Sequence, residues 1–333
     1  MRQLGYVRPN DPAQAVATVT DDPEARFLAG GTNLVDHLKL GIAVPETLVD
    51  VSHLPLDAIE ELDGGGLRVG TNVRNSDLAA HRRLRTEWPA VARALLSGAS
   101  GQIRNQATTG GNLLQRTRCV YFQDPTTPCN KREPGTGCSA IGGYQRYNAV
   151  LGASPDCVAV HPSDLAVALT ALGATVVTLA SDGGRRRRVE DLHRLPGYEP
   201  QHDTVLEHGE LITALELEPS ATARRSTYVK VRDRASYAFA LVSVAVGVDV
   251  DEDLTVRDVR IAWGGAAHKP WRAERAETAL RGTTLTEERV RAAVDQELTS
   301  AETSEGTAYK VPLLRNTTAL AFRRLVPDLE EER

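Results

Sequence analysis

Residues 27–34 read Phe27-Leu28-Ala29-Gly30-Gly31-Thr32-Asn33-Leu34. This stretch leads from the end of an apolar strand pattern through two glycines into the start of an apolar helix pattern. Glycines let a backbone come close to a ligand, and the first N–H groups of a helix are unpaired donors that suit an anion. The stretch therefore predicts a phosphate-binding loop, with an ordinary tight Gly-Gly turn as the competing interpretation.

A second glycine pair follows at residues 107–113, which read Ala107-Thr108-Thr109-Gly110-Gly111-Asn112-Leu113. It combines small hydroxyl residues, two glycines and an asparagine in a different order from the first loop. Two such loops could hold the two phosphates of one dinucleotide. Neither matches the G-x-G-x-x-G pattern of a Rossmann site or the Gly-Lys-Ser/Thr ending of a P-loop, so those two kinds of site are unsupported.

The periodicity of apolar residues divides the 333-residue chain into three units. We expect a small α/β unit at residues 1–58, a second unit at residues 59–222 and a third at residues 223–333. Helices are expected at residues 34–40, 76–80, 89–96 and 164–172, and as three helices after residue 271. Strands are expected at residues 26–28, 47–51, 67–69, 175–179, 186–189 and 256–263, with a long apolar strand region at residues 238–250.

Residues 115–159 lack any periodicity and hold all four cysteines, at intervals of nine, eight and eighteen residues. Disulfides are disfavoured because the chain shows no export signal. Zinc sites usually have cysteines paired two to four residues apart, whereas an iron–sulfur cube accepts wide and uneven spacings. Cys119, Cys129, Cys138 and Cys157 are therefore candidate cluster ligands, with structural zinc, unliganded thiols and disulfides left open.

The overall charge and hydropathy of the chain exclude several classes of function. A net charge of -5 and a pI near 6.0 argue against nucleic-acid binding. The basic run at residues 185–188 is too local to reverse this and is expected to flank a solvated hairpin. No apolar run approaches the roughly 20 residues of a membrane helix. The N-terminus lacks an export pattern, so we expect a cytoplasmic protein, or a periplasmic one if a partner exports it.

Three segments together resemble the FAD-binding subunit of molybdenum hydroxylases of the xanthine dehydrogenase and carbon monoxide dehydrogenase type. They are residues 28–34, residues 103–112 beginning Ile103-Arg104-Asn105-Gln106, and Pro162-Ser163-Asp164-Leu165-Ala166. Residues from about 225 onward, including Tyr228-Val229-Lys230, are similar to the C-terminal domain of that flavoprotein. The cysteine segment resembles the version found in bacterial, periplasmic-type aromatic aldehyde oxidoreductases, whose flavin subunit carries a 4Fe-4S cluster.

The resemblance implies an α+β fold. It comprises a two-subdomain FAD-binding domain of the vanillyl-alcohol-oxidase (PCMH) type with an iron–sulfur insertion at residues 115–159. An α+β C-terminal domain of the carbon monoxide dehydrogenase flavoprotein type should follow.

The resemblance also implies roles for single residues. Asp164 would bond hydroxyl groups of the ribityl chain or adenosine, although an Asp before an apolar helix is also an ordinary N-cap. Lys230 would lie near the flavin ring, with a solvated strand lysine as the alternative, and His161 would be structural. The residues implied to hold the pyrophosphate are Leu28, Ala29, Gly30, Gly31, Thr32, Asn33 and Leu34 on one side and Thr108, Gly111 and Asn112 on the other.

The implied function is electron transfer inside a multi-subunit aldehyde oxidoreductase, with no catalytic residue of its own. A large molybdopterin subunit would hydroxylate the substrate, and a small 2Fe-2S subunit would pass electrons to FAD. The 2Fe-2S centres are placed on a separate subunit because two of them need about eight thiolates beyond the cysteines of this chain. The external acceptor would be a quinone, ferredoxin, O2 or NAD. Alternatives are the flavin subunit of a hydroxybenzoyl-CoA reductase or a xanthine dehydrogenase-like enzyme, and, from another class, a non-enzymatic zinc-stabilised assembly protein.

Overall fold

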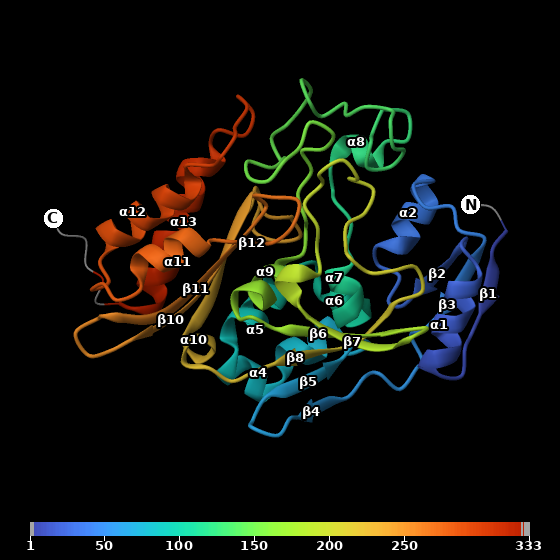
Figure 1. Ribbon diagram of the computed structural model, residues 1–333, viewed down its shortest axis with the longest axis horizontal. Helices are drawn as coiled ribbons and strands as arrows, with labels where there is room; N and C mark the ends of the chain where they lie inside the picture. The colour runs from blue at the N-terminus through green and yellow to red at the C-terminus, as the bar shows by residue number, and fades with distance from the viewer. Residues whose placement is uncertain (1–2, 328, 330–333) are drawn as a thin grey trace.

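The computed structural model describes residues 3–327 and 329 and arranges their strands in three sheets. The sheets follow one another along the long axis of the molecule, with the N-terminal unit at one end and the C-terminal helices at the other (Figure 1). The expected mixed α+β architecture is confirmed. Within the described residues, no helix is both long and apolar enough to cross a membrane.

The N-terminal sheet has three parallel strands in the order β1-β3-β2. The first glycine loop follows β2 and leads into α2, as the sequence predicts. Helix α1 packs on this sheet through Ala15, Val16 and Val19, which lie on one helical face. The elements are β1 (Gly5–Val7), α1 (Pro12–Asp21), β2 (Ala25–Leu28), α2 (Leu34–Leu40) and β3 (Thr47–Asp50).

The middle sheet has five antiparallel strands in the order β4-β5-β8-β6-β7. Its central strand β8 was not among the predicted strands. The strands are β4 (Ile59–Glu61), β5 (Leu67–Gly70), β6 (Thr175–Ala180), β7 (Gly183–Arg188) and β8 (Leu211–Leu217). The helices are α3 (Asn75–Ala80), α4 (Arg82–Glu87), α5 (Pro89–Ser97), α6 (Gly101–Gln106), α7 (Thr109–Leu113), α8 (Val120–Gln123), α9 (Asp164–Ala171), α10 (Ala221–Arg224) and the 3-10 turn at Val189–Asp191.

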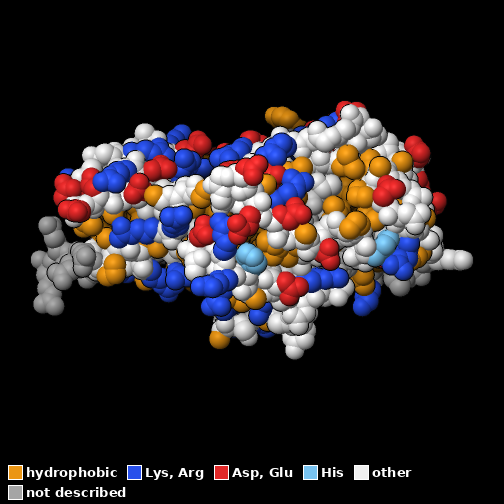
Figure 2. Space-filling model, turned by 90° about the horizontal axis from the view of Figure 1, so that it is seen from below, with side chains coloured by type: hydrophobic (Ala, Val, Ile, Leu, Met, Phe, Trp, Pro, Cys, Tyr) orange, Lys and Arg blue, Asp and Glu red, His pale blue; other side chains and the backbone are white. Residues whose placement is uncertain are grey.

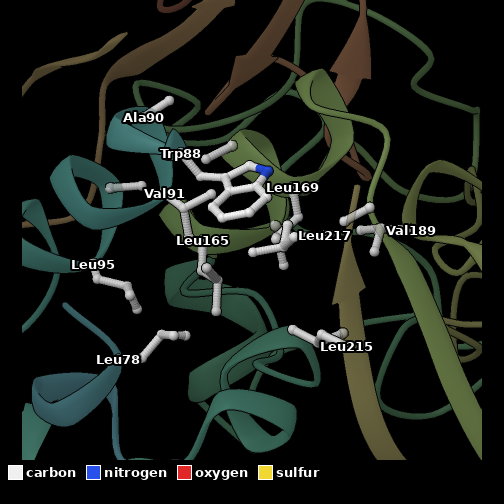
Figure 3. Packing of buried hydrophobic residues seen from close by; sticks show 14 of the residues in the cluster. Leu78, Trp88, Ala90, Val91, Leu95, Leu165, Leu169, Val189, Leu215 and Leu217 are labelled. Atoms are coloured by element: carbon white, nitrogen blue, oxygen red, sulfur yellow. The ribbon is translucent and has the colours of Figure 1, made fainter. Parts of the chain in front are cut away.

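The core of the middle unit is built around Trp88, whose side chain is fully buried. Figure 3 shows its indole among Leu165 and Leu169 of α9 and Leu217 of β8. The indole Nε1 donates a hydrogen bond of 3.1 Å to the carbonyl of Glu218, so the one polar atom of the ring is satisfied. Helices α5 and α9 are thereby fixed on the sheet.

The C-terminal sheet has four antiparallel strands in the order β12-β11-β10-β9. Residues along β10 alternate between its faces. Val244 and Val246 belong to the core shared with α11 to α13, whereas Ala245 belongs to the core of the middle unit. The elements are β9 (Ser226–Val231), β10 (Val242–Val250), β11 (Val256–Gly264), β12 (Trp271–Arg272), α11 (Glu274–Leu280), α12 (Glu287–Leu298) and α13 (Lys310–Leu325).

The basic run forms the edge strand β7 of a hairpin with β6, so the predicted hairpin is confirmed. Its turn is tighter than expected, because the glycines at 183 and 184 already belong to the strand. Arg187 lies 2.8 Å from Glu210 and Arg186 pairs with Glu216, so the chain's own carboxylates offset the charge. Acidic and basic side chains are also mixed on the face shown in Figure 2.

Candidate functional site

The two glycine loops lie in direct contact although the first belongs to the N-terminal unit and the second to the middle unit. A Cβ atom added to Gly30 would stand 2.4 Å from the carbonyl oxygen of Gln106, where no real Cβ could fit. The Gln106 side chain in turn donates a hydrogen bond of 3.2 Å to the Gly30 carbonyl. Gly31 has φ +73°, a conformation that side chains rarely adopt. The glycine at position 30 thus allows the backbones of two units to touch directly.

A cavity of about 520 Å³ opens beside these loops, between helices of the first two units and strands of the C-terminal sheet. Of the predicted site residues, Thr32, Gly111, Asn112, Asp164 and Lys230 line it. The other predicted residues do not line the cavity and lie in the loops behind it: Leu28, Ala29, Gly30, Gly31, Asn33, Leu34 and Thr108.

Two asparagines tie the loops to their neighbours. The Asn33 Oδ1 atom accepts a hydrogen bond of 3.0 Å from the backbone N–H of Arg116. The Asn112 Oδ1 atom accepts bonds of 2.7 Å from the Ser163 hydroxyl and 2.9 Å from the Gln115 side chain. Both loops are therefore anchored to the start of the cysteine segment, and the second loop also to Ser163 just after that segment.

The side chains of Asp164 and Lys230 form a buried ion pair at the cavity wall. The Lys230 Nζ atom lies 2.7 Å from Asp164 Oδ2, and only 3% of the lysine side chain is exposed. The Tyr228 hydroxyl donates a 2.5 Å bond to Asp164 Oδ1. Two alternative interpretations of the sequence are wrong. Lys230 is not a solvated strand lysine. The N-cap of α9 is Ser163 and not Asp164, because the Ser163 hydroxyl accepts a hydrogen bond from the Ala166 N–H.

Several buried polar atoms that line the cavity have no hydrogen-bond partner within the described residues. They are Asn75 Oδ1, Arg118 Nε, Asn148 Nδ2 and His161 Nε2. Buried polar groups are normally paired, so these atoms are suited to a polar ligand. Asn75, Arg118 and Asn148 were not predicted as site residues from the sequence. Only the position of Arg118 next to Cys119 could have drawn attention to it.

His161 packs its ring 4.2 Å from the ring of His193. Burial, and next the neighbouring His193, hold the pKa of His161 well below its ordinary value of 6.5. The imidazole is therefore neutral at physiological pH. Its packing fits the structural role that the sequence suggested, while its free nitrogen adds polarity to the cavity wall.

The four cysteines surround a second, smaller cavity inside residues 115–159. Cys129 and Cys138 face each other across an antiparallel bridge, and Cys157 pairs with Ser154 in the same way. Burial is the largest of the effects that together raise the pKa of Cys157 to about 12, and the neighbouring Cys138 and Cys129 act in the same direction. In the part of the chain that the structure describes, no three His, Cys, Asp or Glu side chains are arranged as a metal-binding group.

Polar bonds cross-link this segment, in addition to the packing of Val150 and Leu151 in the C-terminal core. The Arg132 guanidinium donates to the carbonyls of Tyr121 and Phe122 at 2.7 and 2.9 Å. The Asn130 side chain accepts from Gly137 N–H at 2.7 Å and donates to the Asp156 carbonyl at 3.2 Å. These bonds cross between the stretches that carry the cysteines, and so they hold the four thiols in one region.

Lys131 anchors the segment to the rest of the protein. Its fully buried Nζ atom lies 2.5 Å from Asp203 and donates a 2.8 Å bond to the Pro200 carbonyl. Burial raises the pKa of Asp203, but Lys131 and Arg116 more than offset this and hold it below the usual range. The carboxylate is therefore ionised and paired.

The two cavities share a wall. Cys119, Asn148 and Ala159 line both of them. Figure 1 shows the segment with α8 bridging the space between α2 and β12. A group held by the cysteines would therefore lie next to a ligand of the larger cavity.

Comparison with known proteins identifies matches along almost the whole chain. Residues 2–219 match the family described as FAD binding domain in molybdopterin dehydrogenase, and residues 227–324 match the CO dehydrogenase flavoprotein C-terminal domain. The chain is 48% identical over 320 residues to the aldehyde oxidoreductase FAD-binding subunit PaoB of Escherichia coli K12, covering 96% of this chain and 97% of that protein. It is 24% identical to the glyceraldehyde dehydrogenase medium chain of Sulfolobus acidocaldarius, covering 97% and 98%.

Solved structures share the fold. Carbon monoxide dehydrogenase from Hydrogenophaga pseudoflava superposes with a TM-score of 0.76 at 23% identity and covers 99% of both chains. Quinoline 2-oxidoreductase from Pseudomonas putida 86 gives a TM-score of 0.74 at 22% identity, with 97% of both chains covered. The expected combination of an FAD-binding domain and a flavoprotein C-terminal domain is confirmed.

Replacing Gly30 by Ala should deplete bound FAD, because the new methyl carbon would collide with the Gln106 carbonyl and force the two loops apart. The ratio of flavin to protein after purification measures the effect. Gly101→Ala is the matched control, since a Cβ there meets nothing within 4 Å. Equal flavin contents in the two variants would contradict the role of this contact.

Removing the Asp164 carboxylate by Asp164→Ala should lower the free energy of unfolding by about 3–5 kcal/mol, because Lys230 is left as an unpaired buried charge. Denaturant unfolding measures the loss. The double variant with Lys230→Met should recover part of it, since the uncompensated charge is then absent. If the single variant is as stable as the wild type, the pair is not the buried interaction described here.

Proposed function

Because this chain belongs to the family of FAD-binding medium subunits of molybdenum hydroxylases, we propose that it holds one FAD between the two glycine loops and relays electrons as a subunit of an aldehyde oxidoreductase. The observation that carries the proposal is the cavity beside the contact between Gly30 and Gln106, lined by unpaired buried polar atoms. Such a wall suits an elongated polar cofactor.

The loop residues would position the cofactor rather than take part in chemistry. The stretch from Leu28 to Leu34 and the loop at Thr108, Gly111 and Asn112 would enclose the pyrophosphate, with backbone N–H groups as donors. Asp164 would meet hydroxyl groups of the cofactor while its other oxygen holds Tyr228. Because Asp164 offsets the charge of Lys230, the lysine would act on the cofactor mainly by holding Asp164 in place and only weakly through its own charge. Bound FAD supplies a ring that accepts and releases electrons singly or in pairs.

The assignment to aldehyde oxidation follows the relative that is 48% identical and is named as an aldehyde oxidoreductase subunit. A partner subunit with molybdopterin would oxidise the substrate, and a small 2Fe-2S subunit would deliver electrons to this chain. The flow would continue from FAD to an external acceptor. In this proposal the two FAD-binding subdomains comprise residues 1–58 and 59–222, and the C-terminal domain comprises residues 223–333. A hydroxybenzoyl-CoA reductase or xanthine dehydrogenase-like subunit is the second candidate.

We further propose that Cys119, Cys129, Cys138 and Cys157 hold one 4Fe-4S cluster. Support comes from their common cavity and from the polar bonds that hold residues 115–159 around it. The buried cation of Lys131 lies close enough to affect the Cys157 thiol, and a cluster with four thiolates carries net negative charge. The thiols do not form a preorganised metal group, so binding would draw them together, as coupled metal binding and folding allows.

The purified chain should contain about one FAD per protein and show flavin bands in its visible absorption spectrum. Extraction of the flavin followed by quantification against protein checks this. A protein without flavin absorbance, even after incubation with excess FAD, would overturn the proposed function and favour the zinc-stabilised assembly protein instead.

Anaerobically prepared protein should contain about four iron and about four sulfide per chain, as a cube with four thiolate ligands requires. Replacing any one cysteine by Ser should lower both counts together and increase protease sensitivity within residues 115–159. Ser181→Ala, in the exposed turn between β6 and β7, is the control and should leave both counts unchanged. Stoichiometric zinc without sulfide, or full iron retention in all four Ser variants, would disprove the cluster.

A further inference from the structure

Arg118 places a guanidinium group at the wall of the larger cavity without an anionic partner. Its Nε atom is buried and unpaired, and within the described residues no carboxylate lies within ion-pair distance of it. Its Cζ atom stands 4.8 Å from the centre of the Phe239 ring. Stacking uses the flat face of the group and leaves the N–H donors at its edge free to bind.

All but Asp36 of the other charged side chains that line this cavity are already engaged. Lys230 pairs with Asp164, and Asp233 pairs with Arg146 at 2.7 Å. Arg104 donates to the Gly98 carbonyl at 2.7 Å and Arg234 to the Tyr237 carbonyl at 2.9 Å. Asp36 is exposed and lies beyond ion-pair distance of Arg118. Among the basic side chains of the described cavity wall, Arg118 is therefore the one whose guanidinium takes part in no hydrogen bond or ion pair.

The backbone places Arg118 close to both glycine loops. Two residues before it, the Arg116 N–H bonds to the Asn33 side chain of the first loop at 3.0 Å. Three residues before it, the Gln115 side chain bonds to Asn112 of the second loop at 2.9 Å. An arginine side chain from this position reaches the space that the loops enclose.

We propose that Arg118 is a further FAD-binding residue, whose guanidinium meets the negative charge of the cofactor. That charge resides on the pyrophosphate and, in the reduced state, on the flavin ring. The proposal rests on the proposed function and adds a residue from the cysteine segment to the FAD site. Because Cys119 follows directly, one short stretch then serves both cofactors, and disorder in the cysteine segment lowers FAD affinity.

The test compares Arg118→Met with wild type in protein stripped of flavin, using titrations with FAD and with ADP. Loss of a charge-assisted bond should weaken FAD about 10- to 100-fold. A parallel loss for ADP identifies the pyrophosphate as the bound anion. An unchanged ADP affinity with a lower reduction potential of the bound flavin identifies the reduced ring. Arg194→Met, which removes an exposed pair with Glu199, is the control and should bind FAD normally.

Arg118→Lys keeps the charge but loses the planar fork, so its FAD affinity should lie between those of wild type and Arg118→Met. It also provides the test if the methionine variant does not fold. Wild-type affinity and potential in a folded Arg118→Met, or in Arg118→Lys when that variant alone folds, overturn the proposal. Failure of the wild-type chain itself to bind FAD is a different result, which defeats the proposed function instead.

Discussion

The close approach of Gly30 to the Gln106 carbonyl is the constraint on which the site depends. It joins the end of a parallel sheet to the end of helix α6 in the neighbouring unit without a side chain between them. Any Cβ at this point would force the two backbones apart. Since each loop contributes one wall of the cavity, this contact sets the width available to a ligand. The glycine is therefore required for packing between units, and the ligand-facing positions are Thr32 and Gly111.

The cysteine segment shows how a long stretch without an apolar core keeps one conformation. Basic side chains enter it and bind backbone carbonyls: Arg132 holds Tyr121 and Phe122, and the buried Lys310 of α13 donates to Asn148 and Gly265 at 2.7 Å each. Backbone carbonyls have no alternative partners once water is excluded, so these bonds are costly to break. The same bonds attach the segment to the C-terminal unit.

The sequence predicted those helices, strands and turns whose formation depends on residues close together in the chain. Helix α2, the hairpin of β6 and β7 and the long strands of the third unit follow from apolar periodicity and turn residues. Strand β8 inserts between β5 and β6 from more than thirty residues downstream, which no local pattern reveals. The pairing of Lys230 with Asp164 depends on how the fold places β9 beside the start of α9, so residue types alone suggested a free cation. Arg118 was overlooked because its significance is the absence of a partner, a property of the fold and not of the sequence.

Four titratable groups in or next to the cavity wall keep a constant charge near neutral pH. Burial and then His193 hold His161 in its neutral form, while burial and then Asp164 raise the pKa of Tyr228 well above 10. At the mouth, the hydrogen bond from Arg146 lowers the pKa of Asp233, and Asp233 raises that of Tyr147. Each of these shifts moves a titration away from pH 7. Near pH 7 these four groups would therefore not couple electron transfer at a bound flavin to their own protonation.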